Sequence, residues 1–421
     1  MLIRLIYSTL LTLVSPFFLY SLYKKKEGKP SVGKRWKEHF GLTPKLSNTY
    51  PLWIHAVSVG EVIAVSPLIK EIKRHSPEQG ILLTTTTSTG AEQAAKLDCL
   101  VEHRYMPLDF SFAINSFLKK TQPSQLLIME TELWPNTIHC VARAGINITV
   151  INARLSQRSA DRYSKVSAIF NLLTKDINKI LCQHQDDAQR FIKLGIAKSK
   201  VEVTGSIKFD ITISQQLKEQ SYQLRNTLGS KRPIWIAAST HQGEDEQVLA
   251  AHQEILKVIP EALLILVPRH PERFNAVYSL TGNAGFNVIK RSQKAEMSKT
   301  IEVYLVDTMG EMLILLGAAD ICFMGGSLIG NKVGGHNLLE PAAIGLPTIT
   351  GPSFFNFTDI TKQLCNANAT TIINNSSELN NQVIHLLTNK EQQEQQGKAA
   401  LNVVQENQGA ITKTLHYLQL L

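Results

Sequence analysis

Short apolar runs rich in β-branched residues alternate along the chain with longer stretches in which apolar residues recur at helical spacing. Each apolar run has the length of one strand, and each longer stretch has the length of one helix. This alternation is typical of a parallel sheet with helices on both faces. The apolar runs predict strands at 51–57, 80–86, 101–106, 126–130, 147–152 and 178–183, and then at 233–238, 262–268, 302–306, 320–324 and 346–350.

A polar stretch interrupts this alternation near the middle of the chain. The 421 residues are too many for one ordinary domain, and either half is long enough to bury its own core. We therefore expect an α/β protein with two Rossmann-like, doubly wound domains. The predicted divisions are 1–23 as an N-terminal membrane anchor, 24–50 as a basic segment, 51–209 as the first domain, 210–231 as a linker and 232–421 as the second domain.

The anchor is predicted from an uncharged segment that runs from Leu5 to Tyr23. As a helix it would be about 28 Å long, close to the roughly 30 Å of a bilayer core. Hydroxyl side chains and Pro16 make it less apolar, so a helix lying in the membrane interface and a buried helix remain alternatives. No cleavage site follows, and the basic residues come after the segment. The positive-inside rule therefore predicts a signal anchor with the later domains on the cytoplasmic side of a membrane.

The net charge of +9 is concentrated near this segment. Residues 1–40 carry eight basic and two acidic side chains, which is +6 of the total. Basic residues beside an apolar segment favour anionic lipid headgroups over nucleic acid as a partner. The five cysteines are scattered without a C-x-x-C pair, which suits a reducing compartment and excludes a disulfide framework or a zinc ribbon.

Most of the unusual motifs directly follow a predicted strand. In open α/β sheets, ligands bind at the carboxyl ends of the strands. We therefore expect the active site at such ends, in a cleft between two of them. The motifs are SVGE at 58–61, TTTS at 85–88, ETE at 130–132, ASTHQG at 238–243, PRH at 268–270, DTMGE at 307–311 and GGS at 325–327.

The acidic motifs of the first half each have two interpretations. Ser58 and Glu61 have the spacing of a helix capping box, but a carboxylate at a strand end could also serve as a general base toward an acceptor hydroxyl. Glu130 and Glu132 could be ordinary acids at a helix start. Alternatively, they converge with Glu61, and the carboxylates raise one another's pKa as a catalytic base requires.

The motifs of the second half suggest an anion site. Arg269 at a strand end could hold an anion or form a surface ion pair. Thr308 and Glu311 again have capping-box spacing, and a free helix N-terminus binds phosphate. A glycine-rich stretch from Gly325 to Glu340 offers a second close approach of the backbone. Lys208, near the domain junction, is either catalytic or merely solvated.

The motifs taken together resemble a known family. The strings HAVSVGE, TTTTSTG, METELWPN, INARLS, VTGSIKFD, ASTHQGE, LVPRHPERF, DTMGEM, GGS and GGHNLLEPA closely resemble those of the 3-deoxy-D-manno-octulosonic acid (Kdo) transferases, glycosyltransferase family 30. The match covers essentially the whole chain in the right order. One departure is the stretch 327–334, which is longer than the family's usual join.

The resemblance implies a GT-B fold and inverting transfer of Kdo from CMP-Kdo to a lipid A precursor in lipopolysaccharide synthesis, at the cytoplasmic face of the bacterial inner membrane. It implies Glu61 as the base, with Glu130 and Lys208 stabilising the transition state. It also implies a set of CMP-binding residues. These are Pro268, Arg269, Met309, Gly310, Glu311, Asn337, Leu338, Leu339 and Glu340.

No convincing metal-ligand spacing occurs, so we expect metal-independent transfer without a cofactor. The nearest rival is another membrane-associated GT-B transferase that uses a different nucleotide sugar, such as a UDP-sugar, on a lipid. A dinucleotide-dependent oxidoreductase is disfavoured because the first strand–helix turn lacks G-x-G-x-x-G. A non-enzymatic membrane scaffold would have no reason to place acids and glycines at its strand ends.

Overall fold

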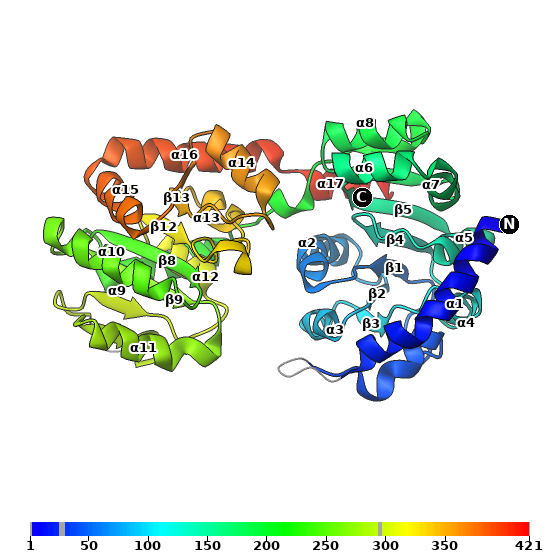
Figure 1. The fold of residues 1–421 in the computed structure, drawn as a ribbon, viewed down its shortest axis with the longest axis horizontal. Helices are drawn as coiled ribbons and strands as arrows, with labels where there is room; N and C mark the ends of the chain where they lie inside the picture. Colours follow the sequence, from blue (N-terminus) through cyan, green and yellow to red (C-terminus); the bar gives the residue numbers. More distant parts are fainter. Residues whose placement is uncertain (1, 25–29, 294–296, 421) are drawn as a thin grey trace. The chain divides into compact units, whose positions relative to one another are not determined.

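The computed structural model describes residues 2–24, 30–293 and 297–420. The chain forms two compact units, each of which is a parallel sheet with helices on both faces (Figure 1). Unit 1 comprises Met1–Asp210 and Asn407–Leu421, and unit 2 comprises Ile211–Glu406.

Unit 1 contains a seven-stranded sheet in the order β3-β2-β1-β4-β5-β6-β7. Its strands are β1 Leu52–His55, β2 Ile81–Thr85, β3 Glu102–Tyr105, β4 Gln125–Met129, β5 Asn147–Ala153, β6 Lys179–Cys182 and β7 Val201–Val203. Its helices are α1 Leu2–Tyr23, η1 Gly33–Phe40, α2 Val59–His75, α3 Ser88–Ala95, α4 Ser111–Thr121, α5 Pro135–Arg143, α6 Gln157–Ser164, α7 Ser167–Thr174, α8 Gln185–Lys193, η2 Lys198–Lys200, η3 Ile207–Phe209 and α17 Ala410–Tyr417.

Unit 2 contains a second seven-stranded sheet in the order β10-β11-β9-β8-β12-β13-β14. Its strands are β8 Ile234–Thr240, β9 Leu263–Pro268, β10 Val288–Lys290, β11 Val303–Leu305, β12 Ile321–Met324, β13 Thr348–Thr350 and β14 Thr370–Ile372. Its helices are α9 Gln215–Leu228, α10 Asp245–Val258, η4 Pro271–Arg273, α11 Phe274–Asn283, η5 Arg291–Gln293, α12 Met312–Gly317, η6 Gly330–Lys332, α13 Leu339–Ala343, α14 Thr358–Asn366, α15 Ser376–Thr388 and α16 Lys390–Asn407.

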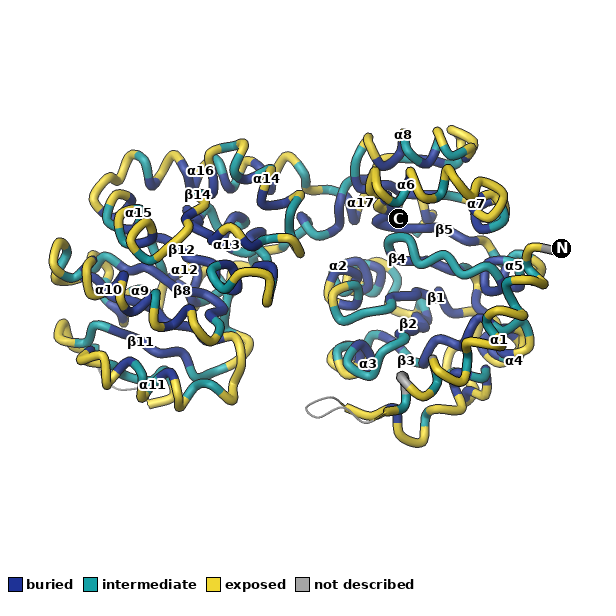
Figure 2. Tube along the Cα trace, viewed as in Figure 1, coloured by how far each residue is buried: buried dark blue, intermediate teal, exposed yellow. Residues whose placement is uncertain are grey.

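The central strands are buried on both faces, as the dark blue strands of Figure 2 show. In β1, Trp53 packs into one hydrophobic cluster, whereas Leu52 and Ile54 pack into the cluster on the opposite face. Successive side chains of a strand point to opposite faces, so a strand covered on both sides has to be apolar throughout. This explains why these strands were visible in the sequence as continuous apolar runs.

All eleven predicted strands are present, and three further strands were missed. The missed strands β7, β10 and β14 have three residues each and lie at sheet edges. Apart from Val201 and Thr370, their residues are partly buried or exposed. Strands of three residues with so few buried side chains are too short to appear as an apolar run in the sequence.

Two segments differ in structure from the sequence-based expectation. The stretch 210–231, expected to be a linker, contains the helix α9, which packs against α12 within unit 2. The end of the chain, expected in the second domain, forms α17, which packs against α2 and η3 of unit 1. The Asp210 carboxylate accepts hydrogen bonds from the backbone N–H groups of Gly409 (2.6 Å) and Ile411 (2.5 Å), which ties the chain end to unit 1.

The structure does not support a membrane-spanning form of the predicted anchor. Residues Leu2–Tyr23 do form the helix α1. Within the described residues, however, no helix combines the length and apolarity needed to cross a bilayer. The physical reason lies in the hydroxyl residues of α1 and in its contacts with unit 1, where Arg4 and Ser8 each hydrogen-bond the Asn136 side chain at 3.2 and 3.0 Å.

Candidate active site

The acidic motifs of unit 1 follow two neighbouring strands. Strands β1 and β4 pair in parallel, with His55 opposite Ile128. The carboxyl ends of parallel strands lie at the same edge, so the turn that carries Glu61 and the turn that carries Glu130 are adjacent. The sequence prediction that these carboxylates converge agrees with this placement.

Glu61 forms the capping contacts and also meets the other acids. Ser58 is the N-cap of α2, and its hydroxyl accepts the Glu61 N–H. The Glu61 carboxylate accepts the Val57 N–H at 2.9 Å and the Ser58 hydroxyl at 3.1 Å. The pKa of Glu61 is raised to about 7, chiefly by burial and also by the negative charges of Glu130 and Glu132, against the hydrogen bonds from Val57 and Ser58 that lower it. Capping and an elevated pKa therefore coexist in one side chain.

Glu130 is held in an unusual backbone conformation beside a lysine. Its φ of 55° lies in the left-handed region, which costs of order 1–3 kcal/mol and often marks a functional site. Lys208 donates from Nζ to Glu130 Oε1 at 3.3 Å, and both side chains are about one-third exposed. The structure thus brings Glu61, Glu130 and Lys208 together within unit 1.

Asn152 positions the lysine, a role that the sequence reasoning did not assign. Its side-chain oxygen accepts the Ile207 N–H at 3.2 Å, next to Lys208 in η3. Asn152 itself has a φ of 51° and is fully buried. Asparagine tolerates the left-handed region better than other non-glycine residues, so an asparagine at a strand end was the available signal.

A buried network fixes the turn after Glu132. The Trp134 indole donates to Glu132 at 3.3 Å and packs edge-on against His55. Helix α5 begins directly after Trp134. Asp109 accepts hydrogen bonds from the first turn of this helix, including the Asn136 N–H at 3.0 Å. Tyr7 of α1 also hydrogen-bonds with Asp109. Helix α1 therefore supports the acidic turn as well as lying on the surface of unit 1.

In unit 2, the predicted CMP-binding residues lie at the carboxyl ends of neighbouring strands. Pro268 ends β9, and Arg269 follows it with its N–H donated to the Thr240 carbonyl at 2.9 Å. Within the described residues Arg269 forms no ion pair, and its positive charge opposes the burial that raises the pKa of Glu340. The charge of Arg269 is thus available to an anion.

The turn at Met309, Gly310 and Glu311 follows β11, the neighbour of β9. Its predicted capping box does not form, because helix α12 begins only at Met312 and Glu311 itself is the N-cap. The Glu311 carboxylate is instead held by Thr308 and by Arg291, at 2.8 Å from the latter's Nη2. These contacts, Arg291 foremost, lower the pKa of Glu311.

The glycine-rich stretch is organised around an internal carboxylate. Glu244 is fully buried and accepts the backbone N–H groups of Gly326, Ser327 and Leu328 at 2.6 to 2.9 Å. It therefore occupies the amides that a bound phosphate would otherwise use. The sequence showed Glu244 only as a polar residue after a glycine, and nothing in the pattern revealed that it would be buried.

The remaining predicted residues lie at the start of α13. Asn337 accepts the Leu339 N–H through its side-chain oxygen at 3.1 Å. Leu338 and Leu339 are buried in the core, so only their backbones could contact a nucleotide. In the longer stretch 327–334, Gly334 is required by packing, since a Cβ there would lie 2.4 Å from the Phe355 ring.

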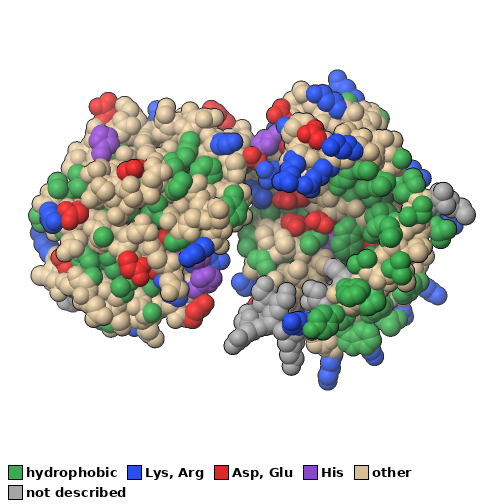
Figure 3. All heavy atoms as spheres, in the orientation of Figure 1, with side chains coloured by type: hydrophobic (Ala, Val, Ile, Leu, Met, Phe, Trp, Pro, Cys, Tyr) green, Lys and Arg blue, Asp and Glu red, His purple; other side chains and the backbone are tan. Residues whose placement is uncertain are grey.

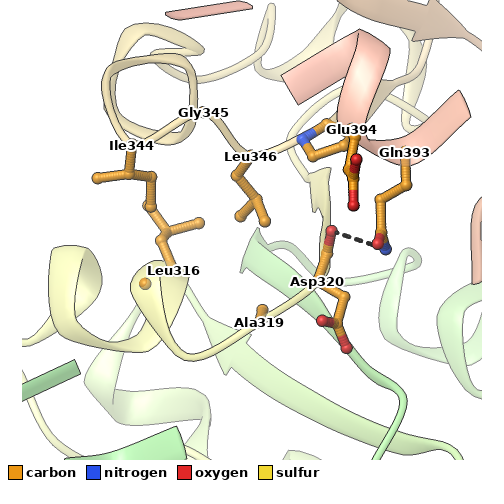
Figure 4. Close-up of a pocket in the computed structure, with 10 residues that line it drawn as sticks. Leu316, Ala319, Asp320, Ile344, Gly345, Leu346, Gln393 and Glu394 are labelled. Atoms are coloured by element: carbon orange, nitrogen blue, oxygen red, sulfur yellow. Dashed lines mark hydrogen bonds between the residues drawn. The ribbon is translucent and has the colours of Figure 1, made fainter. Parts of the chain in front are cut away.

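A cavity of about 230 Å³ in unit 2 lies apart from these motifs (Figure 4). It is lined by Asp320 and Pro347, which precede strands β12 and β13, and by Gln393 of α16, whose amide hydrogen-bonds the Asp320 carbonyl. It therefore opens at the amino ends of the strands and holds none of the predicted site residues. In the part of the chain that the structure describes, no group of three or more His, Cys, Asp or Glu side chains is arranged to hold a metal ion.

Comparisons with known proteins identify the class to which this chain belongs. Residues 34–211 match the family model "3-Deoxy-D-manno-octulosonic-acid transferase (kdotransferase)", and residues 235–403 match "Glycosyl transferases group 1". A solved UDP-GlcNAc 2-epimerase from Neisseria meningitidis is 14% identical with a TM-score of 0.55, covering 86% of this chain and 100% of its own, which is a likeness of fold alone. The chain is thus a glycosyltransferase with a GT-B-like α/β fold.

Full-length relatives define the family more narrowly. A 3-deoxy-D-manno-octulosonic acid transferase from Haemophilus influenzae is 40% identical over 99% of this chain and 98% of its own. Another, from Rickettsia bellii, is 31% identical over the same shares. The chain belongs to the Kdo transferase family.

Proposed function

We propose that this glycosyltransferase moves Kdo from CMP-Kdo to a lipid A precursor, with inversion and without a metal ion, in lipopolysaccharide synthesis. The observation that carries the proposal is the convergence of Glu61, Glu130 and Lys208 in unit 1, together with the pKa of about 7 at Glu61. Family membership supports the choice of sugar.

Glu61 acts as the general base. A carboxyl group with a pKa of about 7 is about half ionised at neutral pH and is more basic than an ordinary glutamate, so it accepts the acceptor hydroxyl's proton readily. Burial keeps that pKa high with a contribution from the charge of Glu130, and Lys208 stabilises negative charge near the reacting atoms. Inversion requires a single base on the acceptor side, which is the role we give to unit 1.

Unit 2 holds the donor nucleotide. Arg269 lies at a strand end, where a guanidinium binds phosphate oxygens well. We assign the CMP site to Pro268 and Arg269, to the turn from Met309 to Glu311, and to 337–340. The charge that develops on the departing CMP is stabilised by protein cations, which is why we expect no metal requirement.

The lipid acceptor places the enzyme at a membrane surface. One side of α1 exposes large apolar side chains, among them Leu13 at 67% and Phe17 at 78%. Figure 3 shows hydrophobic side chains gathered on the face of unit 1 where α1 lies. Such a helix lies in the headgroup region without crossing the bilayer, and we propose this attachment for α1.

The test is incubation of the purified protein with preformed CMP-Kdo and a tetra-acylated lipid A precursor, followed by mass spectrometry of the lipid. We expect the lipid to gain Kdo, and to do so equally in excess EDTA. Transfer from a UDP-sugar in place of CMP-Kdo would establish the rival GT-B activity instead. Full inhibition by EDTA that magnesium reverses would overturn the metal-independent mechanism.

A further inference from the structure

Three histidines meet at the carboxyl end of the unit 2 sheet. His241 follows β8, His270 follows β9, and His336 lies in the glycine-rich stretch after β12. The Nε2 atoms of His241 and His336 are 2.9 Å apart, and the two ring planes differ by only 10°. The His270 ring packs edge-on against His241, with 5.2 Å between the ring centroids. None of these three side chains has a role in the mechanism above.

The surrounding backbone holds the His241–His336 pair in place. Glu244 accepts the His241 N–H at 3.0 Å and the Gly326 N–H at 2.6 Å, so one buried carboxylate fixes both flanking loops. Gly326 has a φ of 69°, and a Cβ there would lie 2.9 Å from the His336 ring. Gly335 then donates its N–H to the Gly326 carbonyl. Backbone hydrogen bonds and close packing therefore hold the two histidine rings in place, and their contact is not a chance meeting of two surface side chains.

The geometry of the pair limits its protonation states. A hydrogen bond between two Nε2 atoms needs one ring to donate and the other to accept. In the neutral pair, one Nδ1 atom then carries a proton and the other does not. Adding one proton makes both Nδ1 atoms donors while the bond between the rings is kept. Among the residues that the structure describes, neither Nδ1 atom has a hydrogen-bond partner, so both donors are available to a ligand.

Burial and the surrounding positive charges keep the histidine pair neutral. Burial lowers the pKa of His336 to about 4, and His241, Arg269 and His270 act in the same direction. Burial also lowers the pKa of His241; Arg269, His270 and Arg273 add to this effect, and Glu244 opposes it. Of the other acids on adjoining elements, Asp245 is paired with Arg273, and Glu340 lies within the field of Arg269. An anion bound here would offset these positive charges and favour uptake of a proton.

We propose that the His241–His336 pair binds an oxyanion of the donor sugar nucleotide and takes up one proton from solvent as it does so. The ligand presents two such groups, the phosphate and the carboxylate of an acidic sugar. Two Nδ1–H donors on coupled rings suit the two oxygens of either group. The inference rests on the proposed function, because it assumes an anionic donor in unit 2, and it adds a specificity element that a neutral sugar would not engage.

The experiment measures proton uptake on binding by isothermal titration calorimetry. The full-length protein is titrated with CMP-Kdo at pH 7.5, without acceptor, in two buffers that differ in ionisation enthalpy. We expect uptake of about one proton and an affinity that falls about tenfold per pH unit above neutrality. Equal heats in both buffers, with normal binding of CMP-Kdo, would overturn the inference.

Variants and a second ligand sharpen the test. His336→Asn keeps a donor but cannot be protonated, so it should abolish the uptake and weaken CMP-Kdo binding at least tenfold. His241→Asn should do the same, and His385→Asn, on an exposed part of α15, should behave as wild type. Proton uptake that persists in both His336→Asn and His241→Asn would refute the proposal that this histidine pair takes up the proton. Titration with CMP alone identifies the anion: uptake with CMP indicates the phosphate, and uptake confined to CMP-Kdo indicates the carboxylate.

The result is separable from that of the proposed function. If the protein binds neither CMP nor CMP-Kdo, the proposed donor is wrong and the histidine assignment falls with it. If it binds and transfers Kdo without proton uptake, only the inference about the histidines is refuted. Should His336→Asn fail to fold, the two-buffer measurement and the pH dependence on the wild-type protein still decide the question.

Discussion

The two units gather opposite charges at the same place in the same kind of sheet. In unit 1 burial raises the pKa of Glu61, and the carboxylates of Glu130 and Glu132 add to that shift. In unit 2 burial lowers the pKa values of His241 and His336, and Arg269 and its neighbours add to that shift. Both clusters lie at the carboxyl ends of parallel strands, where side chains of several loops converge. The fold supplies the position, and the residues placed there supply the chemistry that we propose, a base in unit 1 and an anion site in unit 2.

The two units also use buried carboxylates differently. In unit 2 the Glu244 carboxylate accepts hydrogen bonds from backbone N–H groups and holds the loop after β12. In unit 1 the Glu61 carboxylate accepts capping hydrogen bonds but remains partly exposed and keeps a raised pKa. Burial with full hydrogen bonding makes a structural acid, and partial burial beside like charges makes a candidate base. The predictions below test this contrast, beginning with the largest expected effect.

Glu61→Gln should lower turnover about a hundredfold or more, the usual size of a general-base contribution. Glutamine can still accept a capping hydrogen bond through its side-chain oxygen, so the melting temperature should change little. CMP binding, which belongs to unit 2, should be unchanged. Turnover and thermal unfolding of Glu61→Gln and Glu61→Ala are the measurements.

The comparison with Glu61→Ala separates capping from catalysis. Loss of the cap should cost about 1 kcal/mol of stability in the alanine variant. Near-normal turnover in Glu61→Gln would leave Glu61 as a capping residue and make Glu130 the next candidate for the base.

Arg269→Ala should weaken CMP binding by about 1.5 to 3 kcal/mol, the range for a hydrogen bond to a charged group, or roughly 10- to 150-fold in affinity. Lys257→Ala, at an exposed position of unit 2, is the matched loss of one positive charge. Calorimetric titration of the two variants with CMP tests whether the affinity depends on the positive charge at Arg269 itself or only on the net charge of unit 2. Equal affinities for CMP in both would mean that Arg269 is an ordinary surface residue.

The positions of the central strands and of most candidate site residues were predictable from the sequence, because these strands are buried on both faces. Continuous apolar runs located the central strands, and the polar residues just after them became the site candidates. Two features escaped. The edge strands β7, β10 and β14 carry no run, and the roles of Asn152 and Glu244 depend on backbone groups that only the folded chain brings near them.

For the N-terminal helix, the sequence pattern located the element but did not reveal its contacts. Its apolar segment was located correctly, but length and hydropathy could not reveal that Arg4, Tyr7 and Ser8 face unit 1. A helix with partners on one side exposes apolar side chains on the other, which is the arrangement that the proposed interfacial attachment requires.

Tyr7→Phe should destabilise unit 1 by roughly 1.5 kcal/mol, because it removes a hydrogen bond to the buried Asp109 carboxyl group. Tyr20→Phe, on an exposed part of the same helix, should change stability by less than about 0.5 kcal/mol. Denaturant unfolding of both variants is the measurement, with CMP affinity as a control on unit 2. Equal stabilities of the two variants would show that the Tyr7–Asp109 hydrogen bond does not stabilise unit 1.

The smallest expected effect concerns the pH dependence of transfer. Glu61 must be ionised to act as a base, so turnover should rise with pH through about 7, the pKa of this carboxyl group. The negative charge of Glu132 contributes to that elevation. Glu132→Gln should therefore lower the pKa of Glu61, move the acid limb of the profile to lower pH, and raise turnover at pH 6 relative to pH 8 by about two- to threefold.

The direction of this shift distinguishes an electrostatic role from a structural one. A variant that merely loosened the turn around Trp134 would lose activity at every pH without moving the limb. Glu78→Gln removes the same charge from an exposed position of unit 1 and should leave the profile in place. A limb that stays fixed in Glu132→Gln while moving in Glu130→Gln would assign the electrostatic effect to Glu130 alone. A limb that stays fixed in both would mean that unit 1 does not raise the pKa of its base through neighbouring charge, and the contrast between the two units would then rest on burial alone.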